Sequence, residues 1–447
     1  MNLYSKLSSL SKAGKSIKCG LIGGGKFGSM LLSQVQRIPA IHIVGIADLD
    51  LFSLKNNLRN IGWNREKYNA TDLKDAVQNE KTYLTSNSEE LINNSKIEII
   101  IEATGDPISA VNHIIESFNN KKSVINVTVE ADAFCGVGLA KKAEKNNLIY
   151  SMAFGDQPAL VCDLVDWGRT CGFNIIAAGR GHKWLPHYRF STPETVCDLW
   201  GLTKQQAERG KLNPKMFNSF LDGSKPAIES AAIANSTNLD VPKNGLVFPS
   251  GSIDEIPNLM RPKSLGGILE KRGMVEVISS LNKDGKQIDY DIRKGVWVCV
   301  ESHNDYVKNC FEEYKLTTDD TGKFFCLYKR WHLIGLELAV SIANVGVRKE
   351  PTGVSKFFNA DVVAISKSDF VRGTILDGEG GKTIYGGLRK SKDSIAQNFL
   401  PLGLAKDVKL KRKIKKDQII TFDDVEINKN SLAFFIRKET ENLLKLK

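Results

Sequence analysis

The feature that most constrains this chain is a glycine-rich turn that directly follows a short apolar stretch. Residues 18–22 have the pattern of a buried strand, and Gly23, Gly25 and Gly28 then match G-x-G-x-x-G. In such a turn the first glycine permits the tight bend, the second lets the backbone approach a pyrophosphate, and the third lets helix and strand pack closely. The pattern predicts a strand, a turn and a helix whose N-terminus holds the phosphates of a dinucleotide.

Two further strands are expected to end beside this turn. Residues 42–47 form an apolar stretch that ends on Asp48, about 20 residues after the last glycine, where an acid would hold a ribose 2′-hydroxyl. Residues 97–103 form another, followed by Thr104 and Gly105. Ligands of open α/β sheets bind at the carboxyl ends of the strands. The predicted cofactor-binding residues are Gly23, Gly25, Lys26, Phe27, Gly28, Asp48, Ala103, Thr104 and Gly105.

The pattern of apolar residues predicts the division of the chain. Strand-like and helix-like stretches alternate to about residue 155, which indicates a parallel sheet covered on both faces. From Gly273 the period changes to two, and residues 275–279 and 296–300 around a turn suggest an antiparallel sheet. Short strands follow residue 350. We therefore expect an α/β protein with an N-terminal Rossmann domain (1–155), a central α+β catalytic and substrate domain (156–350), and a small all-β domain (351–447).

Composition excludes several classes of protein. The 447 residues carry a net charge of +11 and are 42% hydrophobic, as in ordinary globular proteins. No apolar run is long enough for a membrane span, and the polar start predicts no secretory signal. Eight cysteines without a C-x-x-C pair are typical of a reducing cytoplasm. The basic residues between 406 and 416 lack interleaved aromatic residues, which favours a solvated strand over nucleic-acid binding.

A basic loop follows the apolar stretch 173–179. Arg180, His182 and Lys183 supply positive charge there, and Gly181 permits a close approach of the backbone. The loop is typical of an anion-binding site or of the position of a catalytic lysine. A charged surface turn explains the same residues equally well.

The segment 213–230 is dense in polar groups for a helical region. Lys225 and Glu229 are four residues apart, so they share one face of a helix. The segment predicts a lined cleft, and a surface ion pair is the alternative. Its predicted substrate-binding residues, with Arg180 of the basic loop, are Asn218, Ser219, Asp222 and Glu229.

Two carboxylates are expected at the same edge of the first sheet. Glu130 follows the apolar strand 123–128, and Asp156 follows the strand 148–153. The predicted catalytic residues are Lys183, Lys225, Asp156 and Glu130.

Several motifs together resemble one family. The glycine turn and residues 102–105 resemble the nucleotide domain of homoserine dehydrogenases. The segments 127–132, 150–160, 213–223 and 335–338 are similar to the DXP-reductoisomerase-like (DRL) oxidoreductases, which are relatives of homoserine dehydrogenase. The pieces beyond residue 350 resemble the SAF-type (β-clip) module that this family carries at its C-terminus.

The resemblance implies a reaction and a cofactor. It implies NADPH-dependent conversion of 1-deoxy-D-xylulose 5-phosphate to 2-C-methyl-D-erythritol 4-phosphate, a step of isoprenoid precursor synthesis. Such a rearrangement is helped by Mg²⁺ or Mn²⁺ on carboxylates, for which Glu130, Asp156, Asp222 and Glu229 are the candidates. Asp48 departs from the NADPH expectation, because an acid at this position favours NADH.

Two other functions stay open at this point. One is a simpler NAD(P)-dependent dehydrogenase, related to homoserine dehydrogenase, that acts on a hydroxy acid or a semialdehyde without a metal. The other is a binding protein that senses nucleotides. In each case we expect a cytoplasmic homo-oligomer with a small, phosphorylated ligand and with neither a nucleic-acid nor a membrane partner.

Overall fold

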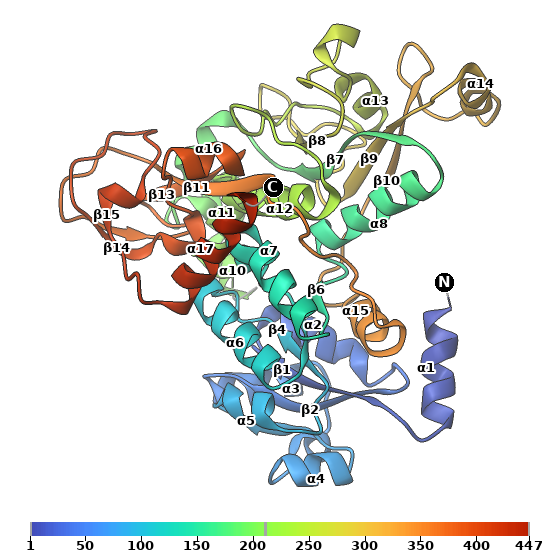
Figure 1. Ribbon diagram of the computed structural model, residues 1–447, viewed down its shortest axis with the longest axis vertical. Coiled ribbons are helices and arrows are strands. Elements are labelled where there is room, and N and C mark those ends of the chain that lie inside the picture. The colour runs from blue at the N-terminus through green and yellow to red at the C-terminus, as the bar shows by residue number, and fades with distance from the viewer. Residues whose placement is uncertain (1, 210–211, 446–447) are drawn as a thin grey trace. The chain divides into compact units, whose positions relative to one another are not determined.

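The computed structural model describes residues 2–209 and 212–445 (Figure 1). Contacts divide the chain into two compact units. Unit 1 consists of Met1–Leu160 and Leu333–Val354, and unit 2 consists of Val161–His332 and Ser355–Lys447. The predicted division at residues 155 and 350 stays a prediction. Within the described ranges, no helix combines the length and the apolar character needed to cross a bilayer.

Unit 1 is built on a six-stranded parallel sheet with the order β3-β2-β1-β4-β5-β6. This is the strand order of the doubly wound dinucleotide-binding fold, so the predicted Rossmann class is confirmed. The strands are β1 (Ile17–Ile22), β2 (Ile41–Ala47), β3 (Tyr83–Thr85), β4 (Ile99–Glu102), β5 (Ser123–Asn126) and β6 (Tyr150–Met152).

The strands of unit 1 are buried because helices connect them across both faces. In β4, Ile99, Ile100 and Ile101 are at most 2% exposed. At the start of the following helix, Asp106 accepts a hydrogen bond from the Ser109 amide and Pro107 occupies the first turn. The helices are α1 (Leu3–Lys12), α2 (Lys26–Val35), α3 (Leu51–Asn60), α4 (Leu73–Gln78), α5 (Ser88–Asn93), α6 (Pro107–Asn119) and α7 (Val129–Lys145). A 3₁₀ turn, η1 (Arg65–Tyr68), completes this part.

A late segment of the chain returns to unit 1. Residues 333–354 contain α15 (Ala339–Ala343) and a π-helical turn, η5 (Asn344–Arg348). The Ser341 hydroxyl accepts a hydrogen bond from the Phe154 amide at 2.7 Å, and the Met152 amide donates to the Gly353 carbonyl at 2.8 Å. This apolar stretch therefore packs on unit 1, although it follows most of unit 2 in sequence.

Unit 2 contains a four-stranded sheet with the order β10-β9-β7-β8. Its strands are β7 (Asn174–His182), β8 (Met274–Ser279), β9 (Val296–Glu301) and β10 (Phe324–Lys329). β8 runs parallel to β7, whereas β9 is antiparallel to both β7 and β10. The expected pairing of 275–279 with 296–300 around one turn is therefore wrong, because β7 is inserted between them.

The centre of unit 2 is the helix α12 (Ser224–Thr237), which is buried along nearly its whole length. Small residues let it contact β7 and β8 as well as β11 (Ala360–Ser366) and β13 (Ile384–Lys390) (Figure 1). The side-chain amide of Asn235 on this helix makes two hydrogen bonds to Ala360. Its Nδ2 donates to the Ala360 carbonyl at 3.0 Å, and its Oδ1 accepts from the Ala360 backbone amide at 2.8 Å. The helix thus joins the middle of the chain to its C-terminal part.

The remaining helical elements between residues 157 and 313 follow one another along the chain. They are α8 (Gln157–Thr170), η2 (Pro186–Phe190), α9 (Val196–Trp200), α10 (Lys204–Arg209), α11 (Pro214–Leu221), η3 (Ile253–Glu255), α13 (Ile256–Leu259), η4 (Lys263–Leu265) and α14 (Asp305–Glu313).

The C-terminal part combines two small sheets with helices. β11 pairs with β13, and β14 (Lys406–Leu410) lies between β12 (Ile375–Asp377) and β15 (Val425–Glu426). Along β14 the lysines are exposed while Val408 and Leu410 are buried, as expected for a solvated basic strand. The helical elements are α16 (Ser391–Ala396), η6 (Leu402–Leu404), η7 (Phe422–Asp424) and α17 (Leu432–Lys445).

A buried carboxylate in β8 fixes a neighbouring loop. Glu276 is 1% exposed and accepts hydrogen bonds from the amides of Val247, Phe248 and Val277 at 3.1, 3.3 and 2.9 Å. Burial raises the pKa of Glu276 to about 7, and the three amide donors oppose that shift.

This carboxylate makes stability depend on pH. Because the pKa of Glu276 is higher in the folded chain than in the unfolded one, the folded state binds the proton more tightly. The free energy of unfolding is therefore expected to fall by on the order of 3 kcal/mol as the pH rises from about 4.5 to 7. Urea unfolding between pH 5 and 8 measures this slope. Glu276→Gln should flatten it, and Glu313→Gln at an exposed site of α14 should not; equal slopes in the wild type and E276Q would contradict the expectation.

Candidate functional site

The glycine turn of unit 1 is held by contacts that leave no room for side chains. Gly23 has a φ of +100°, and a Cβ atom there would lie 2.5 Å from the Ala103 carbonyl oxygen. A Cβ atom on Gly28 would lie 2.4 Å from the carbonyl oxygen of Gly23. Both positions require glycine, because the turn packs directly against the ends of β4 and α2.

Gly25 differs from these two glycines. A Cβ atom on Gly25 would meet nothing within 4 Å, so open space borders the turn here. Gly25 is also the N-cap of α2, and no side chain of the described residues caps that helix. Uncapped amides at a helix N-terminus, next to open space, suit a phosphate group. Lys26 and Phe27 form the first turn of this helix.

Asp48, at the end of β2, stabilises the glycine turn by hydrogen bonds. One carboxylate oxygen accepts from the Gly24 amide at 2.8 Å, and the other accepts from the Asp50 amide at 3.0 Å. Each oxygen keeps a second lone pair, so the carboxylate is still able to accept from a ribose hydroxyl. The structure thus gives Asp48 a local structural role that spacing alone does not reveal.

The carboxyl ends of β4 and β5 are joined through a buried carboxylate. Glu102 is fully buried and accepts hydrogen bonds from the hydroxyls of Thr104 and Thr128, both at 2.5 Å. The Thr128 hydroxyl in turn accepts from the Gly105 amide at 3.0 Å. Thr104 and Gly105 therefore lie at the sheet edge that the sequence predicted. Glu102 and Thr128 were missed, although an acid that ends an apolar strand was a usable signal.

The returning segment of unit 1 packs against both ends of this region. A Cβ atom on Gly335 would lie 2.8 Å from the Phe27 carbonyl oxygen, and one on Gly155 would lie 3.0 Å from the Leu333 carbonyl oxygen. Residues 333–335 therefore border the start of α2 and the end of β6. Sequence reasoning assigned these residues to the central domain and did not connect them with the cofactor site.

The predicted carboxylates of unit 1 follow neighbouring strands. Glu130 lies half-buried in the first turn of α7, and Asp156 is 6% exposed and accepts from the Gln157 amide at 2.9 Å. A further acid, Asp132, is buried and accepts from the Asn126 side chain at 3.0 Å. Burial and the charge of Asp132 hold the pKa of the Tyr150 hydroxyl well above its ordinary value. Tyr150 and Asp132 were missed because nothing local marks them as partners.

In unit 2, Arg180 and His182 are buried in strand β7, so the predicted basic loop is wrong for these two residues and begins only after His182. Arg180 forms an ion pair with Glu229 of α12, and both side chains are at most 4% exposed. Arg180 also lies 3.4 Å from Nδ1 of His182, whose Nε2 donates to the Phe220 carbonyl at 2.6 Å. Burial and the charge of Arg180 hold the pKa of His182 well below its ordinary value, so this imidazole is neutral. The alternatives of a surface turn and a surface ion pair are therefore wrong for these residues.

Lys183 is the partly buried end of the same loop. Its ammonium donates to the carbonyls of Leu199 and Trp200 at 2.9 and 3.2 Å, and it lies 5.5 Å from the centre of the Trp200 ring. Burial and the nearby charge of Arg293 lower its pKa. A lysine in this environment gives up a proton more readily than an exposed one.

The corner between α11 and α12 holds a second buried ion pair. Lys367 of the C-terminal part donates to Asp222 at 2.8 Å and to the carbonyls of Ser191 and Gly381, both at 2.7 Å. Burial raises the pKa of Asp222, while Lys367 opposes that shift. Sequence reasoning selected Asp222 but missed Lys367, because the partner lies 145 residues away.

The other polar residues of α11 also reach the C-terminal part. The Asn218 amide donates to the Gly380 carbonyl at 2.9 Å, and the Ser219 hydroxyl is bonded to Glu379. Lys225 lies partly buried in the first turn of α12. The predicted substrate-binding roles of Asn218 and Ser219 stay predictions, and both residues already hold the 379–381 loop.

The carboxylates of unit 2 do not fit the predicted divalent cation. Asp222 is neutralised by Lys367 and Glu229 by Arg180. Over residues 2–209 and 212–445, no group of three or more His, Cys, Asp or Glu side chains is arranged to hold a metal ion.

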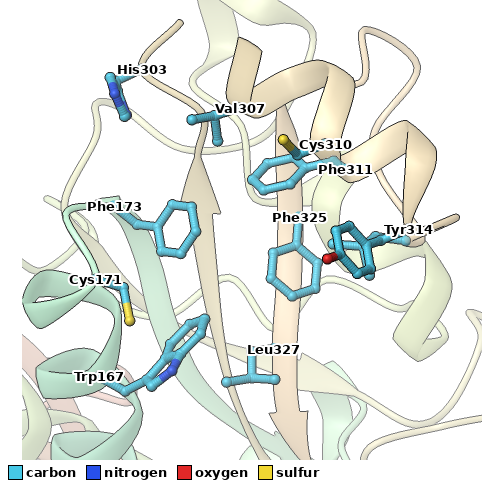
Figure 2. Close-up of a pocket in the computed structure, with 11 residues that line it drawn as sticks. Trp167, Cys171, Phe173, His303, Val307, Cys310, Phe311, Tyr314, Phe325 and Leu327 are labelled. Atoms are coloured by element: carbon cyan, nitrogen blue, oxygen red, sulfur yellow. The ribbon is translucent and has the colours of Figure 1, made fainter. Parts of the chain in front are cut away.

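An apolar pocket of about 460 Å³ lies elsewhere in unit 2, and Figure 2 shows its aromatic walls. The ring centres of Phe173 and Phe311 are 5.9 Å apart, and those of Phe311 and Phe325 are 5.5 Å apart. It contains none of the predicted site residues. A pocket without charge does not suit a phosphorylated substrate.

Together, the parallel sheet of unit 1 and the glycine turn define a protein of the Rossmann class with a second α/β unit. Residues 155–338 match the family model described as oxidoreductase DRL, catalytic domain. The resemblance to DRL oxidoreductases is thus confirmed over these residues, and the enzyme class that it supports is oxidoreductase. The SAF-type module lies outside the matched residues and stays a prediction.

Comparison with other proteins adds only weak likenesses. No curated protein matches this chain in sequence. A DOX-P reductoisomerase in complex with magnesium is 12% identical, with a TM-score of 0.31 over 51% of this chain and 59% of that one. The myo-inositol dehydrogenase from Lactobacillus casei, in complex with NAD(H) and myo-inositol, is 12% identical, with a TM-score of 0.29 over 40% of this chain and 50% of that one. An oxidoreductase domain protein from Kribbella flavida is 13% identical, with a TM-score of 0.28 over 40% of this chain and 46% of that one. The chain thus spans about half the length of these solved structures.

The buried pair of Lys367 and Asp222 gives a stability prediction. Lys367→Met leaves a buried carboxylate without its cation, so we expect a loss of about 3–5 kcal/mol in the free energy of unfolding. Adding Asp222→Asn to that variant should restore part of the loss. Urea unfolding followed by tryptophan fluorescence reports on unit 2, which holds five of the six tryptophans.

A matched control for this measurement is the exposed pair of Lys382 and Glu194, whose side chains are 62% and 57% exposed. Lys382→Met should change stability by less than about 1 kcal/mol. Similar losses in the two lysine variants would show that burial does not set the contribution of Lys367.

Proposed function

We propose that this chain is an NAD(P)H-dependent oxidoreductase whose unit 1 binds the dinucleotide at the carboxyl ends of β1, β2 and β4. The observation that carries the proposal is the glycine turn. Contacts of Gly23 and Gly28 close the turn against the sheet, while Gly25 faces open space at an uncapped helix N-terminus. The DRL catalytic-domain match supports the same class of activity.

The residues of unit 1 fit such a cofactor. The amides at the start of α2, at Lys26 and Phe27, would bind the pyrophosphate, and Asp48 would accept from a ribose hydroxyl. Thr104 and Gly105 would border the nucleotide from the end of β4. A bound reduced nicotinamide would supply a hydride to a carbonyl carbon. The choice between NADH and NADPH rests on Asp48, whose charge favours NADH, against the NADPH that the family implies.

The proposed substrate is a phosphorylated keto sugar, 1-deoxy-D-xylulose 5-phosphate, reduced after rearrangement to 2-C-methyl-D-erythritol 4-phosphate. The resemblance to the DRL family implies this substrate, and the family match supports the oxidoreductase class. In the reduction, Nζ of Lys183 donates a proton to the oxygen of the carbonyl group, and the lowered pKa of Lys183 favours that transfer. Lys225 is the second candidate for this acid. Glu130 and Asp156 are the candidate catalytic carboxylates of unit 1.

One observation favours a second candidate function. Asp222 and Glu229 are each engaged by a buried cation rather than being open to a metal ion. A dehydrogenase that acts on a hydroxy acid or a semialdehyde requires a hydride and a proton donor without a metal. The cytoplasmic location and the homo-oligomer stay predictions.

Dinucleotide binding is tested by placing a negative charge at the open position of the turn. Gly25→Asp should weaken NADPH and NADH binding by about 100-fold, because the carboxylate repels the pyrophosphate. The midpoint of unfolding should not fall, since a Cβ atom at this position meets nothing within 4 Å and aspartate is a favourable N-cap residue. Fluorescence titration of the reduced cofactor measures the affinity. Asn60→Asp adds the same charge at the exposed end of α3 and should leave binding intact; equal affinities in both variants would refute the placement of the pyrophosphate.

The substrate and the proton donor are tested by turnover. Oxidation of NADPH and of NADH is followed with 1-deoxy-D-xylulose 5-phosphate, with and without Mg²⁺ or Mn²⁺. Lys183→Met should lower kcat by about 10²–10⁴-fold with unchanged dinucleotide affinity, whereas Lys263→Met, in the exposed part of η4, should have no effect. Tight dinucleotide binding without turnover would reject this substrate and favour the hydroxy acid or semialdehyde dehydrogenase.

A further inference from the structure

Unit 2 contains a small cavity that the proposed reaction does not use. It holds about 60 Å³, and one water needs on the order of 10–15 Å³ by the same measure. It lies between the loop that follows β7, the 244–248 loop fixed by Glu276, and strand β13. The side chains that carry the argument are Trp184, Arg189, Tyr385 and Arg389.

Two guanidinium groups line this cavity. Arg189 lies 5.4 Å from the centre of the Tyr385 ring and 5.5 Å from that of Trp184. Arg389 donates through Nη1 to the Leu388 carbonyl at 2.7 Å. Burial lowers the pKa of Arg389, Tyr385 opposes that shift, and the charge of Arg189 adds to it. The two positive charges are therefore close enough to repel each other.

Neither guanidinium has a carboxylate partner among residues 2–209 and 212–445. Asp222 lines the same cavity, but it is bound by Lys367. The deeply buried cations of unit 2 behave differently, because each forms an ion pair with an aspartate or a glutamate. These cations are Arg180, Arg261, Lys367 and Arg437. Two neighbouring arginines without such a partner leave uncompensated positive charge in a partly buried place.

Trp184, which lines the same cavity, carries a third N–H donor. Trp184 is 6% exposed, and its indole Nε1 is buried without a hydrogen-bond partner in the described part of the chain. A buried N–H group without an acceptor costs free energy, so such a group calls for an acceptor. The ring itself is held in place by stacking on Phe248, with 4.2 Å between ring centres.

We propose that this cavity is a binding site for a phosphate group, held by Arg189 and Arg389 with the indole N–H of Trp184 as a further donor. Guanidinium groups bind phosphate oxygens through paired N–H donors, and an oxyanion would neutralise the repulsion between the two arginines. The volume suits a group of about five heavy atoms rather than a whole nucleotide. Arg180, which the sequence suggested for this role, is already neutralised by Glu229.

The site does not depend on the proposed reaction, because binding can be measured without cofactor or substrate. Inorganic phosphate is titrated into the full chain at low ionic strength and pH 7.5 by isothermal titration calorimetry. We expect Arg189→Gln and Arg389→Gln each to raise the Kd for phosphate at least tenfold. Arg330→Gln is the control, since Arg330 stacks on Tyr290 and Trp331 outside the cavity and should leave the Kd unchanged.

Two further readouts keep the result interpretable. Thermal unfolding identifies a variant that fails to fold, and Arg389→Lys then serves instead, because it keeps the charge and loses the paired donors. Absence of phosphate binding by the wild type, or an unchanged Kd in both glutamine variants, would overturn the proposal. In a wild-type turnover assay, competition between phosphate and substrate would assign the site to the phosphate of the substrate. A lack of competition would assign it to a separate ligand, and arginine-dependent binding supports the site in either case.

Discussion

Unit 2 depends on buried ion pairs that join parts of the chain far apart in sequence. Arg180 and Glu229 connect β7 to α12, Lys367 and Asp222 connect the C-terminal part to the corner before α12, and Arg437 binds Asp361 of β11 through two nitrogens. Burying each pair costs desolvation free energy, so the main contribution of the pairs is to determine which segments of the chain pack together. A mismatched arrangement would leave a buried charge alone, which is far more costly. These pairs explain why the C-terminal part and residues 161–332 form one compact unit.

Unit 1 is organised by a different constraint, which is the absence of side chains. Gly23 and Gly28 bring β1, β4 and α2 within backbone contact, and Gly335 brings the returning segment against the start of α2. Where unit 2 fixes its geometry with charge, unit 1 fixes it with close packing. The result is a closely packed sheet edge at which Gly25 and Gly105 border open space. The difference matters for chemistry, since a pyrophosphate needs exposed amides whereas a proton donor such as Lys183 needs a partly desolvated environment.

Local patterns predicted the sheet edge of unit 1 well, because the glycine turn, Asp48 and Thr104 each follow their strand directly in sequence. The sites of unit 2 were harder to predict. Lys367 and Arg389 lie in the last quarter of the chain, and no short-range pattern connects them with Asp222 or Arg189. The insertion of β7 between β8 and β9 was missed for the same reason, since alternation of apolar residues identifies a strand but not its neighbour.

The chain passes between the two units three times, after Leu160, after His332 and after Val354. Neither unit is therefore a continuous segment, and a cut at the end of the family match, residue 338, would divide the returning segment. During synthesis, unit 1 becomes complete only after residue 354 has left the ribosome. About 200 residues are synthesised between the last strand of its sheet and the end of the returning segment, which supplies the contacts of Ser341 and Gly353. Folding of the first unit is in this way tied to synthesis of most of the second.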